Sequence, residues 1–88
     1  MNETDLKIFE LINLLKELGT IEYDKDFGDS VGVLKQNLTR IKQGKAHFTT
    51  EHIRKACSVF NVNANWIFGV EKKVFNSLKP QQTKALQN

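Results

Sequence analysis

Apolar residues recur at three- and four-residue spacing through most of the chain, which is the period of an amphipathic helix. Residues 5–18 keep this spacing from one end to the other and predict the first helix. Thr4 is the residue expected to cap its N-terminus, and Gly19 is the residue expected to end it.

Two shorter helices are predicted next, and a glycine turn separates them. The first runs from about residue 24 to 31, with Asp24 as its expected N-cap and Gly32 as its stop. The second runs from about residue 34 to 42, and Gly44 follows it. Their inward-facing residues are Phe27 and Val31 in the first, and Leu38 and Ile41 in the second.

A fourth helix is expected to start at a cap on Thr49 or Thr50 and to run through Phe60. Asn61 can adopt the left-handed conformation that ends it. Asn63 then caps a last turn or two. That last turn holds Trp66 and Ile67 and stops at Gly69, and Val74 and Phe75 are expected to fold back onto the core.

The pattern as a whole predicts an all-α fold, a compact bundle of five helices. No segment of useful length alternates with period two, so no sheet is expected. Residues 76–88 are polar and are interpreted as a tail or a linker beyond a domain at 1–75.

Length and composition narrow the functional classes. A chain of 88 residues and 10.1 kDa is one domain, too small for a catalytic barrel or a doubly wound sheet. The single cysteine excludes an internal disulfide and fits a reducing, cytoplasmic environment. The acidic start does not resemble a signal peptide, and no apolar run could span a membrane.

Charge is distributed unevenly along the chain. Over residues 1–30, three lysines stand against eight carboxylates, whereas over residues 31–58 six basic residues stand against one glutamate. A basic middle beside an acidic start favours a face directed at a polyanion.

The basic segment coincides with the two short helices, and helix, glycine turn, helix is the arrangement of a helix-turn-helix. The outward positions of the second helix are polar or basic, and such side chains can read base edges or hold phosphates. The sequence therefore predicts double-stranded DNA as the partner.

These residues resemble the lambda-repressor-like, or XRE-type, helix-turn-helix family. The resemblance covers roughly residues 5–75 and rests on FGDSVGV at 27–33, LTRIKQGK at 38–45 and FNVNANWIFG at 60–69. It implies a transcriptional regulator, repressor-like, that binds operator DNA as a homodimer. We expected the dimer contact on a last helix over 70–75, because Val70, Val74 and Phe75 exceed what the core needs.

The resemblance also assigns roles. The base-reading positions fall on Lys35, Gln36 and Arg40, and the backbone-holding positions on Gln43, Lys45 and His47. The full candidate site is Lys35, Gln36, Asn37, Thr39, Arg40, Gln43, Lys45 and His47.

The chain departs from the family pattern at three places. Leu34 stands where a small polar cap is common, and Gly28 stands where alanine is usual, at a cost of about 1 kcal/mol in helix stability. The first motif helix carries Asp24, Asp26 and Asp29, which would repel a phosphate unless they point away from it.

Other chemistry has little support in the sequence. The only soft metal ligands, His47, His52 and Cys57, lack the spacing of a metal site, and Trp66 is expected in the core. No nucleophile with a base and no phosphate loop is present, so we expect neither an enzyme nor a cofactor or small-molecule ligand.

The alternative interpretation is an antitoxin-like or other protein-interaction module, whose acidic first half binds a basic protein. It is favoured if acidic and basic residues intermix on the surface of the bundle.

Overall fold

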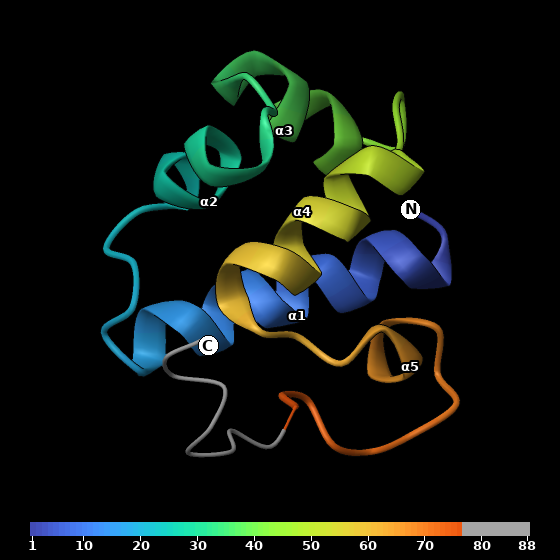
Figure 1. Ribbon diagram of the computed structural model, residues 1–88. Helices are drawn as coiled ribbons and strands as arrows, with labels where there is room; N and C mark the ends of the chain where they lie inside the picture. Colours follow the sequence, from blue (N-terminus) through green and yellow to red (C-terminus); the bar gives the residue numbers. More distant parts are fainter. Residues whose placement is uncertain (77–88) are drawn as a thin grey trace.

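The computed structural model of the protein describes residues 1–76 and contains five helices. They are α1 (Glu3–Glu17), α2 (Asp24–Val31), α3 (Lys35–Lys42), α4 (Thr50–Phe60) and α5 (Ala64–Ile67). In Figure 1, α1 and α4 cross the centre, α2 and α3 lie above them, and α5 lies below. The only strand-like pairing within residues 1–76 is one isolated antiparallel bridge between Val62 and Phe75. The all-α prediction is confirmed. Of the predicted tail over 76–88, only Asn76 is described, and its N–H donates to the Asn61 carbonyl at 3.0 Å; the rest lies outside the described residues.

Two predicted N-caps are wrong, although both helices are where the pattern put them. At α1 the cap is Asn2, whose Oδ1 accepts a hydrogen bond from the Asp5 N–H at 2.8 Å, and Thr4 lies inside the first turn. At α2, Asp24 is the first helical residue. The capping carboxylate there belongs to Asp26, because its Oδ2 accepts from the backbone N–H groups just before the helix.

The other predicted helix ends are confirmed. Thr49 caps α4, accepting from the His52 N–H at 3.2 Å, while the His52 ring accepts from the Thr49 N–H at 3.0 Å. Asn61 ends α4 in the left-handed conformation, with φ of 57°. Asn63 caps α5 by accepting from the Asn65 N–H.

The core lies where the helices meet. Four phenylalanine rings contact one another in a row through the core. Phe9 contacts Phe48, Phe48 contacts Phe27, and Phe27 stacks on Phe60. Trp66 is buried, with the Lys7 ammonium 4.6 Å above its ring centroid. Phe48 is a core residue whose ring contacts α1, α2 and α4.

The prediction of a helix over 70–75 is wrong. This segment folds back along the end of α4 instead, with Asn63 N–H donating to the Val74 carbonyl at 2.8 Å. The buried Asn63 amide also donates to the Lys73 carbonyl at 2.9 Å, so Asn63 holds the returning segment through both its backbone and its side chain. Val74 and Phe75 pack against the core, so they are not surplus to it as the expected dimer contact required, whereas Val70 is exposed.

Candidate nucleic-acid interface

The interface predicted from the sequence is built on α2, a three-residue turn and α3. Gly32 begins the turn with φ of +85°, a conformation that side chains other than glycine rarely adopt. The N–H groups of Gly32 and Val33 both donate to the Gly28 carbonyl at 2.8 Å. Val33 is buried, so the turn is anchored at its centre, and α3 leaves it in a fixed direction.

Gly28 is required by this turn. A Cβ on Gly28 would lie 2.4 Å from the Val33 carbonyl oxygen and 3.2 Å from the Leu38 side chain. The departure from the family's usual alanine therefore follows from close packing of α2 against the turn. Glycine lowers the intrinsic stability of α2, but it allows α2 to pack this closely against the turn.

The outward face of α3 is polar along its whole length. It carries exposed Lys35, Gln36, Asn37, Thr39, Arg40 and Lys42. Helix α3 lies at one extremity of the molecule, at the top of Figure 1. The inward side is formed by Leu38 and Ile41, which are buried as predicted.

Leu34 adds an apolar side chain at the start of this face. It occupies the N-cap position of α3 without any side-chain capping bond, and it is 62% exposed. Leu34 is therefore an exposed apolar group at the start of α3, a property that the absence of a polar cap alone does not indicate.

The acidic residue nearest to α3, Asp24, is neutralised by two lysines. Its carboxylate accepts from Lys16 Nζ at 2.7 Å and from Lys42 Nζ at 2.9 Å. These hydrogen bonds lower the pKa of Asp24 below its usual value, so the carboxylate is held ionised between two cations. Acidic and basic residues therefore intermix at this edge of α3, which is the arrangement that favours the protein-interaction alternative.

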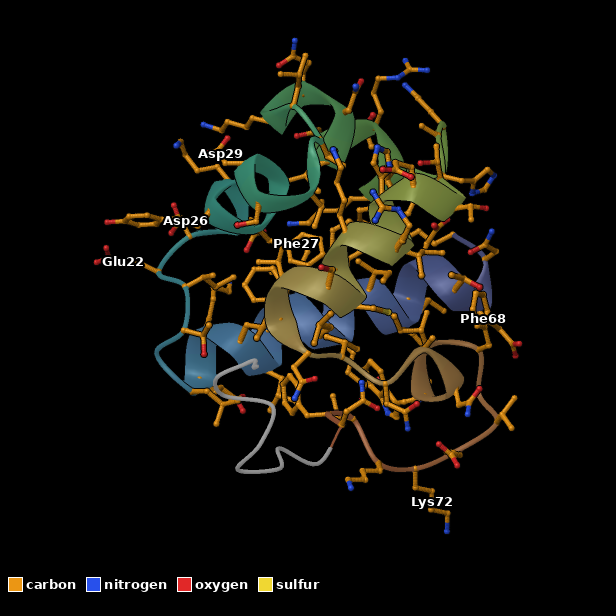
Figure 2. All side chains as sticks on the ribbon, in the orientation of Figure 1. Glu22, Asp26, Phe27, Asp29, Phe68 and Lys72 are labelled. Atoms are coloured by element: carbon orange, nitrogen blue, oxygen red, sulfur yellow. The ribbon has the colours of Figure 1, made fainter. Side chains whose placement is uncertain are left out.

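The other two carboxylates of α2 are also engaged. Asp26 accepts from the Tyr23 and Glu22 N–H groups, and these bonds lower its pKa. Asp29 accepts from Lys25 Nζ at 3.1 Å on the exposed side of α2. Figure 2 shows Glu22, Asp26 and Asp29 projecting to the side of α2, away from the outer face of α3.

The loop after α3 carries two more candidate residues, Gln43 and Lys45. Arg40 Nη2 donates to the Lys45 carbonyl at 3.3 Å, and Gln43 and Lys45 are both exposed. Gly44 allows the turn with φ of +79°. The loop thus continues the basic surface from the end of α3.

His47 is the candidate whose ring has a partner in another helix. Its Nδ1 lies 2.7 Å from Oδ2 of Asp5, a carboxylate on α1 that is 1% exposed. The other carboxylate oxygen of Asp5 accepts from the Phe48 N–H at 3.1 Å. Sequence reasoning missed Asp5, but it left a signal: Asp5 occupies the apolar stripe that Ile8 and Ile12 continue.

In the described part of the chain, no group of three His, Cys, Asp or Glu side chains is placed to hold a metal ion. Burial, followed by the Lys55 charge, lowers the pKa of His52. Burial raises the pKa of the half-buried Cys57 thiol, which disfavours its reactive thiolate form.

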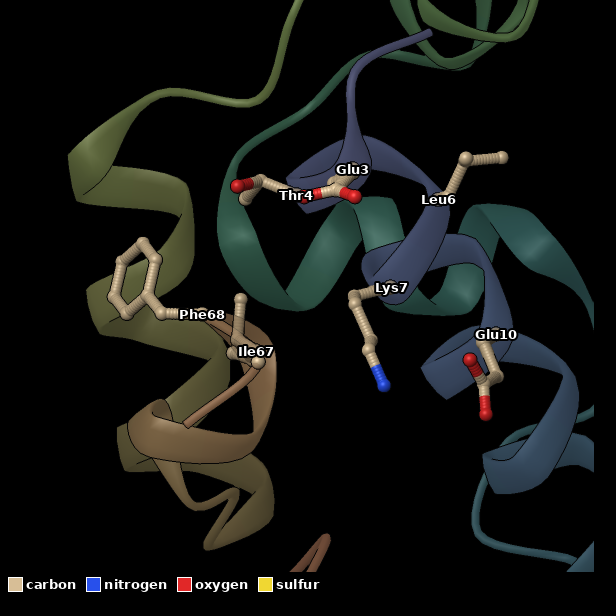
Figure 3. Close-up of a pocket in the computed structure, with 8 residues that line it drawn as sticks. Glu3, Thr4, Leu6, Lys7, Glu10, Ile67 and Phe68 are labelled. Carbon is tan, nitrogen blue, oxygen red and sulfur yellow. The ribbon is translucent and has the colours of Figure 1, made fainter. Parts of the chain in front are cut away.

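A separate groove lies between α1 and α5 (Figure 3) and has a volume of about 420 Å³. Leu6 and Phe68 form its exposed apolar sides, at 51% and 58% exposure. Glu3 and Glu10 lie on its rim, and Lys7 reaches toward Trp66. The groove shares no lining residue with α3.

Comparison of the chain with models of known protein families, with curated proteins and with solved structures found no match. Among the helices of residues 1–76, none is long and apolar enough to cross a membrane.

Proposed function

We propose that this protein is a sequence-specific regulator of transcription that binds double-stranded DNA, with α3 in the major groove. The observation that carries the proposal is the outer face of α3, where only polar and basic side chains are exposed over two helical turns. A helix of this width fits the major groove, and these residue types match base edges and phosphates.

The geometry supports a division of roles on this face. Lys35 and Gln36 open α3, the end that enters the groove first in helix-turn-helix proteins. Arg40 lies one turn later, beside Lys45, where it can reach a base edge or a flanking phosphate. Asn37 and Thr39 share the exposed surface, and Gln43 and Lys45 supply backbone contacts from the loop.

Although acidic and basic residues intermix at Asp24, the two lysines already bound there disfavour a basic protein as the partner of this face. Asp24, Asp26 and Asp29 each have hydrogen-bonding partners inside the domain. A basic partner would have to displace lysines from Asp24 before it could pair with it, whereas a phosphate needs no such exchange.

The decisive experiment is selection from random duplexes with the purified protein, followed by titration at several salt concentrations. We expect enrichment of one motif, and log K should fall with log salt at a slope near −4 to −5 per subunit, about four to six phosphates. Lys45→Ala should reduce this slope by about one. Lys72→Ala is the matched control, since Lys72 is also exposed but projects from the opposite end of the molecule in Figure 2.

Absence of an enriched motif together with a flat salt response would overturn the proposal. Equal reductions of the salt slope by Lys45→Ala and Lys72→Ala would also overturn it, because DNA binding would then depend on the net charge of the protein alone.

The proposed state on DNA is a homodimer. One bundle of this size offers little area for tight specific binding, and two recognition helices about 34 Å apart would occupy successive major grooves. Footprinting on the selected site should show two half-sites; protection of a single half-site by one subunit would contradict the dimer.

A second candidate function, a protein-interaction module, is favoured by the groove between α1 and α5. Its exposed Leu6 and Phe68 beside Glu3 and Glu10 suit a basic segment with an apolar anchor. The test is a titration with a lysine- and leucine-rich peptide, monitored by amide chemical shifts. Shifts confined to α1 and α5, abolished by Leu6→Ser, would support this candidate, and uniform shifts over the surface would exclude it.

A further inference from the structure

Asp5 and His47 form a pair that the DNA-binding role of α3 does not by itself require. Asp5 is a buried carboxylate on α1, and His47 stands 42 residues later in the loop after α3. The 2.7 Å contact between Oδ2 and Nδ1 and the 3.1 Å bond from the Phe48 N–H fix this loop to α1 through both carboxylate oxygens. A carboxylate this deeply buried is retained only where such bonds compensate its loss of water.

The pair fixes how the imidazole faces solvent. A hydrogen on Nδ1 makes the 2.7 Å contact a hydrogen bond that the Asp5 carboxylate accepts. The His47 side chain is 58% exposed, and Nε2 is therefore the nitrogen left for an external partner. Lys45, which is itself a proposed phosphate contact, stands two residues earlier in the same loop.

We propose that His47 binds a DNA backbone phosphate through Nε2 in its doubly protonated form, and that Asp5 is the positioning residue that orients it. This inference rests on the proposed function of α3. It adds a proton to the binding reaction: neutral His47 presents a lone pair to the phosphate, whereas the imidazolium donates a charge-assisted hydrogen bond. DNA binding therefore takes up a fraction of a proton from solvent.

The groups around His47 act on a positive charge there in opposite directions. From α1, Asp5 supplies the negative charge, and the Asn2 amide nitrogen lies 3.4 Å from Nδ1. The Met1 amino group lies near Gly44 and, with Lys45, adds positive charge to the loop. From α4, the His52 ring contacts Phe48, but its Nδ1 accepts from the Thr49 N–H.

The test uses the full chain and a mixed-sequence 20-base-pair duplex, because a phosphate contact does not depend on sequence. Fluorescence anisotropy gives Kd between pH 5.5 and pH 8.0. Calorimetry in two buffers of different ionisation enthalpy gives the number of protons taken up on binding. We expect binding to be about three- to tenfold tighter at pH 5.5 than at pH 8.0, the size of one charge-assisted contact at a surface.

Three variants separate the contributions. His47→Gln should flatten the pH dependence and abolish proton uptake, whereas His52→Gln, the matched histidine control, should retain both. Asp5→Asn keeps the shape of the side chain and a carbonyl acceptor for the Phe48 N–H, but it removes the charge that favours the imidazolium. In this variant the pH profile should move to lower pH, a change that a purely structural role of Asp5 would not produce.

The possible results differ in meaning. If the parent protein binds no duplex at any pH, the proposed function fails, and this inference fails with it. If the parent binds but His47→Gln keeps the same pH profile and proton uptake, DNA binding stands and the inference is overturned. Loss of proton uptake in His52→Gln instead of His47→Gln would also overturn it.

Discussion

Replacing Gly28 by alanine tests whether the turn between α2 and α3 is as tightly built as the structure indicates. Gly28 is a buried helical residue, and by helix propensity alone alanine should stabilise the protein by about 1 kcal/mol. The added Cβ would, however, lie 2.4 Å from the Val33 carbonyl oxygen. The two effects have opposite signs, so the direction of the change is informative.

The steric effect should prevail. To reach ordinary van der Waals contact, the Val33 carbonyl would have to retreat by roughly 1 Å. It has little freedom to do so, because the N–H groups of Gly32 and Val33 are hydrogen-bonded to the Gly28 carbonyl and Val33 is buried. Overpacking of this kind costs about 1–3 kcal/mol. After the helix-propensity gain is subtracted, we expect a net loss of up to about 2 kcal/mol in the free energy of unfolding, which lowers Tm by up to about 15 °C.

Thermal unfolding followed by far-ultraviolet circular dichroism measures this directly. The matched control is Asn13→Ala on the exposed face of α1, which changes helix propensity without adding a contact and should raise Tm slightly. A rise of Tm in Gly28→Ala comparable to that of the control would refute the packing argument. The glycine would then be a cost without a structural reason.

Three further predictions concern acid stability, capping and base recognition. The folded-state pKa of Asp24 is lowered by Lys16 and Lys42, so its contribution to stability is present above pH 4 and is lost as the pH falls through the folded value. Asp24→Asn should accordingly make the decline of Tm between about pH 5 and pH 2.5 shallower, and an unchanged decline would count against the two ion pairs. Thr49→Ala removes the side-chain acceptor at the start of α4 and should lower the free energy of unfolding by about 1 kcal/mol in urea titration, whereas no shift of the midpoint would contradict its capping role. Gln36→Ala should cost about 1–3 kcal/mol on a selected DNA site and little on a scrambled one, and equal losses on both would remove Gln36 from the base-reading face.

The sequence predicted the fold well because helix periodicity is local information. The five helices, the glycine turn at Gly32 and the left-handed Asn61 all follow from side chains within one or two turns of each position. The error at the start of α1 arose because two neighbouring residues could each serve as the N-cap. Asn2 and Thr4 can both cap a helix, and only the structure decides between them, through the bond from the Asp5 N–H to Asn2.

The helix expected over 70–75 failed for a non-local reason. The buried amide of Asn63 donates to the Lys73 carbonyl, and the Asn63 N–H donates to the Val74 carbonyl. With the bridge between Val62 and Phe75, these contacts hold the segment in an extended form against residues outside it. No pattern within the segment itself records that demand.

The candidate site could likewise be predicted only in part from the sequence. The exposed residues of α3 could be listed from the period alone, because Leu38 and Ile41 fix which side is inward. What could not be listed were the pairings that set their electrostatics. Asp24 meets Lys42 across 18 residues, and Asp5 meets His47 across 42, so both depend on the completed packing of the bundle.

The position of Trp66 gives the protein an internal optical reporter. Trp66 is the only tryptophan of the chain and lies buried beneath Lys7, where α1 meets α5. Its fluorescence should shift to longer wavelength when α1 and α5 separate and the ring meets water. It should remain constant when only α3 and its loop respond to a ligand, because the cation over the ring is Lys7 of α1 and Trp66 belongs to α5, which packs on α1. A single emission spectrum can therefore establish, before any binding measurement, that a variant altered on α3 has kept its native core.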